Sequence, residues 1–555
     1  MYQCANCGGE LRFDIASQKV KCSSCSSLFD PKTVLKTDDA EEDNFYDVTV
    51  FHCPQCGGEI TATENTVADF CSFCGASTIL SARMERSKKP SYIIPFKKTK
   101  DDCKKAYAAF ARKSLYTPNE YKDAKFIDGF RGIYMPYWSY YVRHDGKVSL
   151  GLEKSHRSGD YIITDHYRLS GDVDGYYKGL SYDAASSFND EISETIAPYD
   201  AHEMEVFEPS YLLGFYGDTA DVPSTTYDDK VRDIARDETL SKIKKQAQTF
   251  SYSYSNSRET QMKGIPTKIE KVDSTMFPVW FMSYRKHNRV AYATVNGQTG
   301  KVFADMPVSI WKFLIGTILM AIPIFLLLSG AFEHFHLIPT QNLFIVMIAA
   351  FITLIMFDIE MTEIVKSDSG VYDWGMLYAK QKARKEREKK DPKFAEANKK
   401  KPTSKIVTRE DKTSTSPGLV IFLVLLFSVI FTAVGALFVD FMITEFSDGY
   451  SLVLGLVVLV LEAIGAAIFA HSSKTLKTIP VKANVPGSLF SLISLAIGMV
   501  IFFADPANDI YYYFATVLSL VSMFITMMSM MVYYNVLATR PLPQFTNYDG
   551  GDDRA

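Results

Sequence analysis

Apolar residues are distributed unevenly along the chain. After residue 305 they form six long and almost uncharged runs, at 313–332, 338–357, 418–439, 450–470, 486–504 and 510–533. A helix of about 20 apolar residues, rising 1.5 Å per residue, crosses a hydrocarbon core of about 30 Å. The pattern therefore predicts an all-α membrane domain of six spanning helices.

The region 101–305 has a different pattern. A helical spacing of apolar residues begins near Asp101, and from residue 125 onward Tyr, Phe and Gly alternate with polar residues, which favours strands. The segment 135–138 (Met-Pro-Tyr-Trp) is echoed by 277–280 (Phe-Pro-Val-Trp). We expect a β-rich α+β domain with an internal duplication, in which each proline begins an edge strand and each tryptophan packs inside.

A chain of 555 residues is long enough for three or four structural units. The expected organisation is a multidomain one with two tandem β zinc ribbons, the β-rich α+β domain and the membrane domain. The boundaries are 1–35 for the first ribbon, 36–49 for an acidic linker, 50–82 for the second ribbon, 83–100 for a basic linker, 101–305 for the α+β domain, 306–357 for spans one and two, 358–417 for a basic loop, 418–535 for spans three to six and 536–555 for a tail.

Eight of the nine cysteines lie within the first 74 residues. They form two sets of CxxC, fourteen residues and CxxC, and the second set repeats the first after 49 residues: Cys4, Cys7, Cys22, Cys25, Cys53, Cys56, Cys71 and Cys74. Pairs of thiolates at this spacing grip a metal ion from two sides and complete a tetrahedron. The spacing predicts two zinc ribbons, with disulfides, a redox CxxC and a rubredoxin-like iron site as alternatives.

Each zinc ion would be structural, because four cysteines leave no open coordination position. A segment this short buries little apolar surface, so the metal would supply its folding free energy, on the order of 10–16 kcal/mol. The first 80 residues carry five Lys or Arg against twelve Asp or Glu. Nucleic acid binding is therefore disfavoured, and we expect the ribbons to recognise protein.

The basic residues predict how the chain crosses the membrane. The loop 358–417 contains fifteen Lys or Arg and the link 471–485 contains three, whereas the other short links between the runs contain none. Basic loops remain in the cytoplasm, which places the first 305 residues and both termini there. Reduced cysteines, which zinc requires, are typical of the same compartment. The basic loop and linker are expected to contact anionic lipids or to be solvated.

One acidic residue, Glu462, lies near the middle of a predicted span, where an ionised carboxylate is costly. It is a candidate for proton or cation transport, although a buried contact between helices is the more ordinary role. The segment 297–302 resembles a phosphate-binding loop, but its glycines are too close together. No catalytic constellation is recognised in the sequence, and we predict that the protein is not an enzyme.

The knuckles Cys7-Gly8-Gly9-Glu10 and Cys53-Pro54-Gln55-Cys56-Gly57-Gly58, the Pro-x-Trp segments and the C-terminal apolar runs resemble a known family. The chain is similar to double zinc-ribbon (TFIIB-type) membrane proteins of Gram-positive bacteria, some of which are associated with the phage-shock envelope-stress system. The resemblance implies a membrane anchor that recruits flotillin-like SPFH proteins and PspA-like proteins. It carries over only the eight zinc-binding cysteines.

The sequence therefore predicts a membrane-anchored cytoplasmic docking protein that uses its zinc ribbons to bind proteins in envelope stress or membrane organisation. The alternative is a multi-pass transporter or channel with a regulatory zinc-ribbon region.

Overall fold

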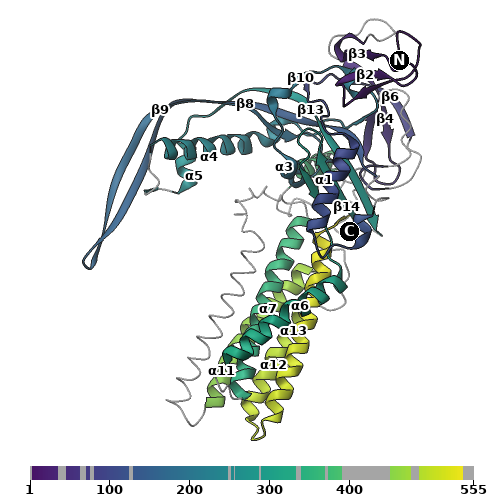
Figure 1. Ribbon diagram of the computed structural model, residues 1–555. Helices are drawn as coiled ribbons and strands as arrows, with labels where there is room; N and C mark the ends of the chain where they lie inside the picture. Colours follow the sequence, from purple (N-terminus) through teal and green to yellow (C-terminus); the bar gives the residue numbers. More distant parts are fainter. Residues whose placement is uncertain are drawn as a thin grey trace.

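The protein consists of a β-rich body and a bundle of long helices (Figure 1). The computed structural model describes residues 3–34, 45–62, 71–75, 81–123, 129–247, 252–254, 257–286, 289–332, 339–368, 373–390, 450–476 and 487–541. The N-terminal strands lie at the end of the body that is far from the helices, and a long hairpin arches away from the body on one side.

Two sheets make up the body. The small one has three antiparallel strands, β1 (Leu11–Asp14), β2 (Lys19–Cys22) and β3 (Leu28–Phe29). The large one has thirteen strands, and its main path runs β10-β7-β13-β8-β11-β5-β4-β6. The strands on this path are β4 (Phe45–His52), β5 (Glu59–Ala62), β6 (Ser81–Lys88), β7 (Tyr92–Ile93), β8 (Arg131–Ser158), β10 (Glu205–Val206), β11 (Tyr216–Gly217) and β13 (Lys268–Lys286).

Five further strands pair off this path, and short helices cover the sheet. The strands are β9 (Tyr161–Asp183), β12 (Ser253–Tyr254), β14 (Arg289–Asn296), β15 (Val302–Ala304) and β16 (Arg540–Pro541). The α-helices of the body are α1 (Lys100–Lys113), α3 (Asp190–Ile196), α4 (Asp228–Gln246) and α5 (Arg258–Lys263), and the 3-10 helices are η1 (Pro31–Thr33), η2 (Asn119–Lys122), η3 (Ala201–Glu203), η4 (Pro209–Leu212) and η5 (Ser224–Tyr227). The expected β-rich middle region is thus confirmed.

The segment 83–100, expected to be a basic linker, contributes strand residues to the large sheet. β6 pairs with β4, and β7 pairs with β10 and β13. The residues that follow β7 enter the core, where Ile94 and Phe96 are fully buried. In the sequence, the many basic residues of this segment made its short apolar stretch, which packs into the core, hard to recognise.

The two Pro-x-Trp segments lie in β8 and β13, which pair with each other. Pro136 lies opposite Met276, and Pro278 lies opposite Tyr134. The expectation that each proline begins an edge strand is wrong, because both lie within long inner strands. Each proline carbonyl still accepts a backbone hydrogen bond, from Ala184 N and from Gly297 N respectively. The sheet therefore accommodates both prolines, although proline has no N–H group to donate to a neighbouring strand.

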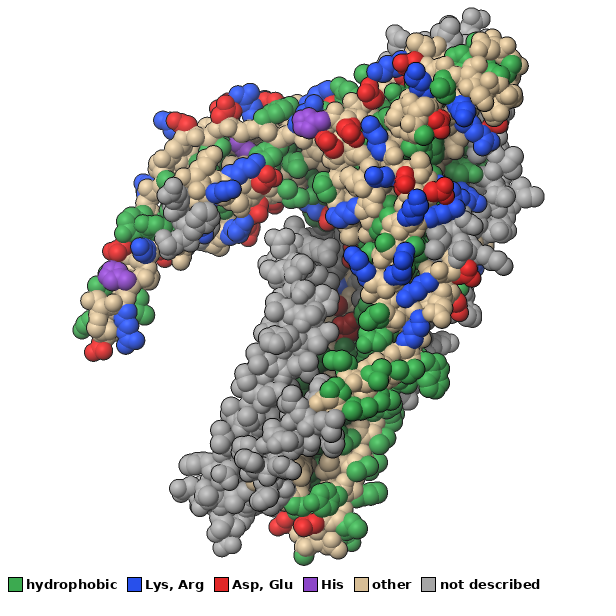
Figure 2. Space-filling model, viewed as in Figure 1, with side chains coloured by type: hydrophobic (Ala, Val, Ile, Leu, Met, Phe, Trp, Pro, Cys, Tyr) green, Lys and Arg blue, Asp and Glu red, His purple; other side chains and the backbone are tan. Residues whose placement is uncertain are grey.

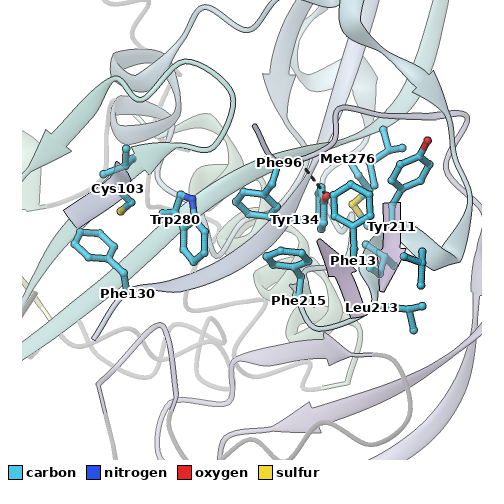
Figure 3. Close-up of a cluster of buried hydrophobic side chains, with 14 of the residues drawn as sticks. Phe13, Phe96, Cys103, Phe130, Tyr134, Tyr211, Leu213, Phe215, Met276 and Trp280 are labelled. Atoms are coloured by element: carbon cyan, nitrogen blue, oxygen red, sulfur yellow. Dashed lines mark hydrogen bonds between the residues drawn. The ribbon is translucent and has the colours of Figure 1, made fainter. Parts of the chain in front are cut away.

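Aromatic residues dominate the core between the small sheet and the large one (Figure 3). Phe96 stacks on Phe215 with ring centroids 4.5 Å apart, and its ring lies 5.1 Å from that of Trp280. The indole Nε1 of Trp280 donates a hydrogen bond to the Lys98 carbonyl. Phe13 of β1 lies 5.4 Å from Tyr211 of η4. The first ribbon therefore packs directly against the body.

The helical bundle contains α6 (Ile310–Phe332), α7 (Pro339–Asp368), α11 (Tyr450–Leu476), α12 (Ser488–Ala504) and α13 (Ile510–Leu537), and α8 (Trp374–Lys390) follows α7. Within the described residues three segments are long and apolar enough to cross a membrane: Pro339–Lys366, Val453–Lys474 and Ile510–Val536. The bundle surface is largely hydrophobic, and Lys and Arg side chains gather where the body meets it (Figure 2).

The predicted count of six spans is corrected to three among the residues that the structure describes. Two predicted spans lie in shorter apolar helices, Ile310–Pro323 and Ser488–Ala504. α12 has only 17 residues, fewer than the roughly 20 that a spanning helix needs. The remaining predicted span, 418–439, lies outside the described residues.

Hydrogen bonds join the last helix to the body. Arg289 of β14 donates through Nη2 to the carbonyls of Val536 and Thr539, at 2.6 and 2.7 Å. Asn535 donates to the Val308 carbonyl and accepts from the Val308 N–H. β16, which follows α13, pairs with β14. The sheet is therefore attached to the first and to the last helix of the bundle.

Candidate metal centres

The first cysteine cluster is held by the two turns on either side of β1 and β2. Cys4 Sγ lies 3.5 Å from Cys25 Sγ, and Cys7 Sγ lies 3.5 Å from Cys22 Sγ. Gly8 takes a φ of 69°, a conformation that favours glycine, and its N–H donates to the Cys4 carbonyl. The chain thereby curls tightly around the first pair of thiols.

The second cluster repeats this arrangement. Cys53 Sγ lies 3.8 Å from Cys74 Sγ, and Cys56 Sγ lies 3.7 Å from Cys71 Sγ. Gly57 takes a φ of 75°, and its N–H donates to the Cys53 carbonyl as Gly8 does to Cys4. The two knuckles therefore have the same backbone form.

Both clusters fit a tetrahedral metal ion. In each of them the four sulfur atoms lie within 4.8 Å of one another. A tetrahedron with metal–sulfur bonds of about 2.3 Å has edges of about 3.8 Å, close to the observed spacing. The cysteines are free thiols, and their sulfur atoms are too far apart for disulfide bonds of about 2.05 Å. Two tetra-cysteine groups that could hold metal ions are therefore present.

Each cluster contains at least one thiol with a lowered pKa. Hydrogen bonding by the Ser27 side chain lowers the pKa of Cys25 to about 6. Hydrogen bonding by the Cys71 thiol lowers the pKa of Cys53 to about 6. Because thiolates are the form that binds metal, one ligand of each site is available near neutral pH.

The two clusters differ in their exposure to solvent. Cys7 and Cys25 are exposed while Cys4 and Cys22 are buried, whereas all four cysteines of the second cluster are buried. The second cluster lies in a core with Phe73, Phe277 and Phe281. Its strand β5 pairs with β11, which also pairs with β8. The second ribbon is therefore part of the large sheet.

The first ribbon is attached to the body mainly through η4. The Phe13 N–H donates to the Leu213 carbonyl at 2.9 Å, and the Ser210 hydroxyl donates to the Pro31 carbonyl. Lys32 forms an exposed ion pair with Glu205 at 2.8 Å. Leu28 on the surface of this ribbon is 49% exposed. This ribbon presents a surface away from the helical bundle (Figure 1).

Glu462, the acidic residue selected from the sequence, lies in α11 apart from the cysteine clusters. Its Oε2 atom is buried and accepts no hydrogen bond from the described residues. The structure adds polar contacts that the sequence did not indicate. Asp358 of α7 accepts from Ser472 and contacts His471 of α11, at 3.0 and 2.9 Å. These residues lie outside any recognisable motif, so only the packing of the helices brings them together.

A second feature missed from the sequence joins α8 to the body. Asp190 of α3 accepts from the Tyr227 hydroxyl and from the Trp374 N–H. Asp373 accepts from Asn189 and from the Met376 N–H at the start of α8. Burial raises the pKa of Asp190 to about 6 and that of Asp373 to about 8. The start of α8 is thus fixed to the body through buried acidic residues.

The chain is similar to one curated relative, "Uncharacterized protein YdjG" of Bacillus subtilis (strain 168). The two are 28% identical over 314 residues, which cover 56% of this chain and 90% of that protein. No family model matches the chain, and no solved structure matches it.

Proposed function

We propose that the chain is a membrane-anchored docking protein whose zinc ribbons bind other proteins at the cytoplasmic face of a bacterial cell membrane. The observation that carries the proposal is the position of the first ribbon. It is fixed to a body that is bonded to the membrane helices, and it faces away from them with Leu28 exposed. A partner bound there is held at a set distance from the bilayer.

Zinc is the metal that the donor set favours. Four thiolates in tetrahedral spacing are typical of structural zinc, and no open position remains for catalysis. Cys4, Cys7, Cys22 and Cys25 would hold one ion, and the buried second cluster would hold the other. Each ion would stabilise its ribbon.

The described helices support an even number of crossings. β15 precedes α6 and β16 follows α13, and both strands pair with β14 on the body side. α8 begins on the body side, while α11 runs alongside α7 and so begins at the far end of the bundle. The chain between the start of α8 and the start of α11 therefore connects the two ends of the bundle.

The cytoplasmic side is proposed from the positions of basic residues. α8 contains seven Lys or Arg and begins at the body. Because basic segments remain in the cytoplasm, the body would lie there too. Its partners would be SPFH and PspA-like proteins if the family resemblance extends to function.

Leu28→Asp tests the docking proposal. Gentle purification of the full-length protein from membranes should recover fewer partner proteins with this variant, because a charge replaces an exposed apolar contact. Ile234→Asp on α4 is the matched control, since Ile234 is similarly exposed at 42%. Zinc content should be unchanged in both variants. Equal recovery of partners with the two variants would refute docking at the first ribbon.

Transport is a second candidate because Glu462 has a buried carboxylate oxygen without a hydrogen bond among the described residues. Glu462→Gln should then abolish cation flux into liposomes that contain the purified protein, while partner recovery stays normal. Unaltered flux, or the absence of flux in the wild type, would leave docking as the function.

A further inference from the structure

The β8–β9 hairpin extends well beyond the rest of the body. The two strands pair continuously to Ser158 and Tyr161 at the tip. β12 is the last strand that covers them, at Leu152 and Glu153. Every residue from Lys154 to Thr164 is exposed. The end of the hairpin is thus a two-stranded ribbon that projects into its surroundings (Figure 1).

The tip of this hairpin is apolar where a solvated turn would be polar. Tyr161 and Ile162 are 77% and 76% exposed, and Ile163 is 43% exposed. Gly159 takes a φ of 61°, as the first central residue of a type II′ turn does. Isolated two-stranded ribbons are only marginally stable in water. Three adjacent exposed apolar side chains on such a ribbon indicate a surface that is covered in the working protein.

Charged side chains accompany the apolar ones. Arg157 lies opposite Ile162 in the pairing, and its Nε donates to the Gly159 carbonyl. Lys154 lies farther from the tip, and Asp160 occupies the turn itself. A tip with a carboxylate at its end cannot enter hydrocarbon cheaply, whereas apolar side chains flanked by charged ones suit the headgroup layer.

The residues at the start of α6 are of the kind found in the headgroup layer. Trp311 and Leu115 are each 75% exposed there. The Tyr116 ring lies 5.7 Å from that of Phe313, and Lys312 donates to the Thr117 carbonyl. Aromatic and basic residues at the end of an apolar helix are typical of the membrane interface.

The hairpin bends toward the side of the helical bundle. In Figure 1 it arches over and down on the side of the bundle, and its tip lies level with the helices. Figure 2 shows hydrophobic, basic and acidic side chains together at the same tip. The apolar tip therefore points toward the side of the body from which the helical bundle extends.

We propose that the hairpin tip, residues 157–163, is a second membrane contact, which inserts Tyr161, Ile162 and Ile163 into the headgroup layer of the leaflet from which α6 enters. The occupant of the apolar tip is the lipid of the same bilayer. The proposal rests on membrane anchoring by the helices and is independent of the docking function. Two separated contacts would hold the body in one orientation over the membrane.

Site-specific photocrosslinking tests this contact. The full-length protein would carry p-benzoylphenylalanine in place of Ile162, Trp311 or Lys19, in vesicles of phosphatidylethanolamine and phosphatidylglycerol. Trp311 is the positive control, and the exposed Lys19 of the first ribbon is the negative one. Lipid adducts at position 162 should approach those at 311 and exceed those at 19 by about tenfold.

A companion variant tests the role of the neighbouring side chains. Tyr161→Asp with Ile163→Asp should lower the lipid adducts at position 162 by about tenfold, while those at 311 stay constant. Adducts at 162 as weak as those at 19 would overturn the proposal, as would crosslinks mainly to a second copy of the chain. Normal labelling at 311 in those cases would leave the membrane anchor itself intact.

Discussion

The two cysteine ribbons share one sequence pattern and one knuckle conformation, yet they belong to the protein in different ways. The first has its own three-stranded sheet and two exposed thiols, whereas the second lies in the thirteen-stranded sheet with four buried thiols. A metal ion in the first ribbon would stabilise a surface module, and one in the second would stabilise the body. The duplicated motif thus occupies two different settings in the fold.

The difference follows from one set of backbone pairs. β5 of the second ribbon pairs with β11 through Thr61 and Ala62. The equivalent strand of the first ribbon, β1, pairs only with β2 among the described strands, apart from the single hydrogen bond from Phe13 to Leu213. Loss of the second metal should therefore disturb the body more than loss of the first.

The largest effect is expected from the matched variants Cys56→Ser and Cys7→Ser, which remove equivalent ligands. Cys56→Ser should lower the free energy of unfolding of the body by roughly 5 kcal/mol or more, because it removes the metal and leaves buried thiols without it. Cys7→Ser should leave the body stable. Thermal unfolding of the solubilised full-length protein, with zinc content, measures both. Equal destabilisation by the two variants would contradict the division.

Phe13→Ala should detach the first ribbon without unfolding the rest. Its ring is buried against Tyr211, and removing a buried phenylalanine typically costs about 3–5 kcal/mol. Limited proteolysis should then cleave near residue 35 much faster than in the wild type. Phe45→Ala is the control, because that ring is 41% exposed. Unchanged cleavage would mean that the ribbon is held by other contacts.

A chelator should remove the metal ions from the two sites one after the other. Exposed Cys7 and Cys25 give a chelator direct access, so the first zinc should leave about tenfold faster than the second. Release into a zinc-sensitive dye would show two phases, and Cys7→Ser should remove the fast one. A single phase in the wild type would indicate that burial does not separate the sites.

The smallest predicted effect is a change of stability with pH, caused by a residue that follows the strand paired with the second ribbon. Burial raises the pKa of Asp218, which follows β11, to about 7. Because its folded pKa exceeds the unfolded one of about 4, the folded state holds the proton more tightly, and stability falls as pH rises between these values, by at most about 1.4 kcal/mol per unit.

Asp218→Asn should flatten this part of the stability curve. Denaturant unfolding of the zinc-loaded protein between about pH 5 and pH 7 measures the slope. Asp229→Asn, at a position with a side chain 88% exposed, should leave it unchanged. An equal slope in wild type and Asp218→Asn would show that Asp218 does not titrate in this range.

The clusters could be predicted from the sequence because their geometry is local. A CxxC knuckle with glycine after it folds the same way wherever it occurs, as Gly8 and Gly57 demonstrate. The long apolar helices followed from composition for the same reason.

The parts that could not be predicted depend on pairs of residues far apart in the chain. Nothing near Thr61 indicates that it will pair with Gly217, and nothing near Pro136 indicates that Met276 will lie opposite. The meeting of Asp358 with His471 likewise depends on helix packing. Sequence patterns report which face of an element is apolar but not which distant element covers it.

The pairing of β16 with β14 has a consequence for biogenesis. Arg540 follows the last membrane helix, yet it pairs with Val290, which precedes the first. The edge of the sheet can close only after every intervening helix has been synthesised and inserted. Completion of this edge of the sheet therefore waits for the end of the chain, and a chain stalled at an earlier helix lacks the strand that covers Val290.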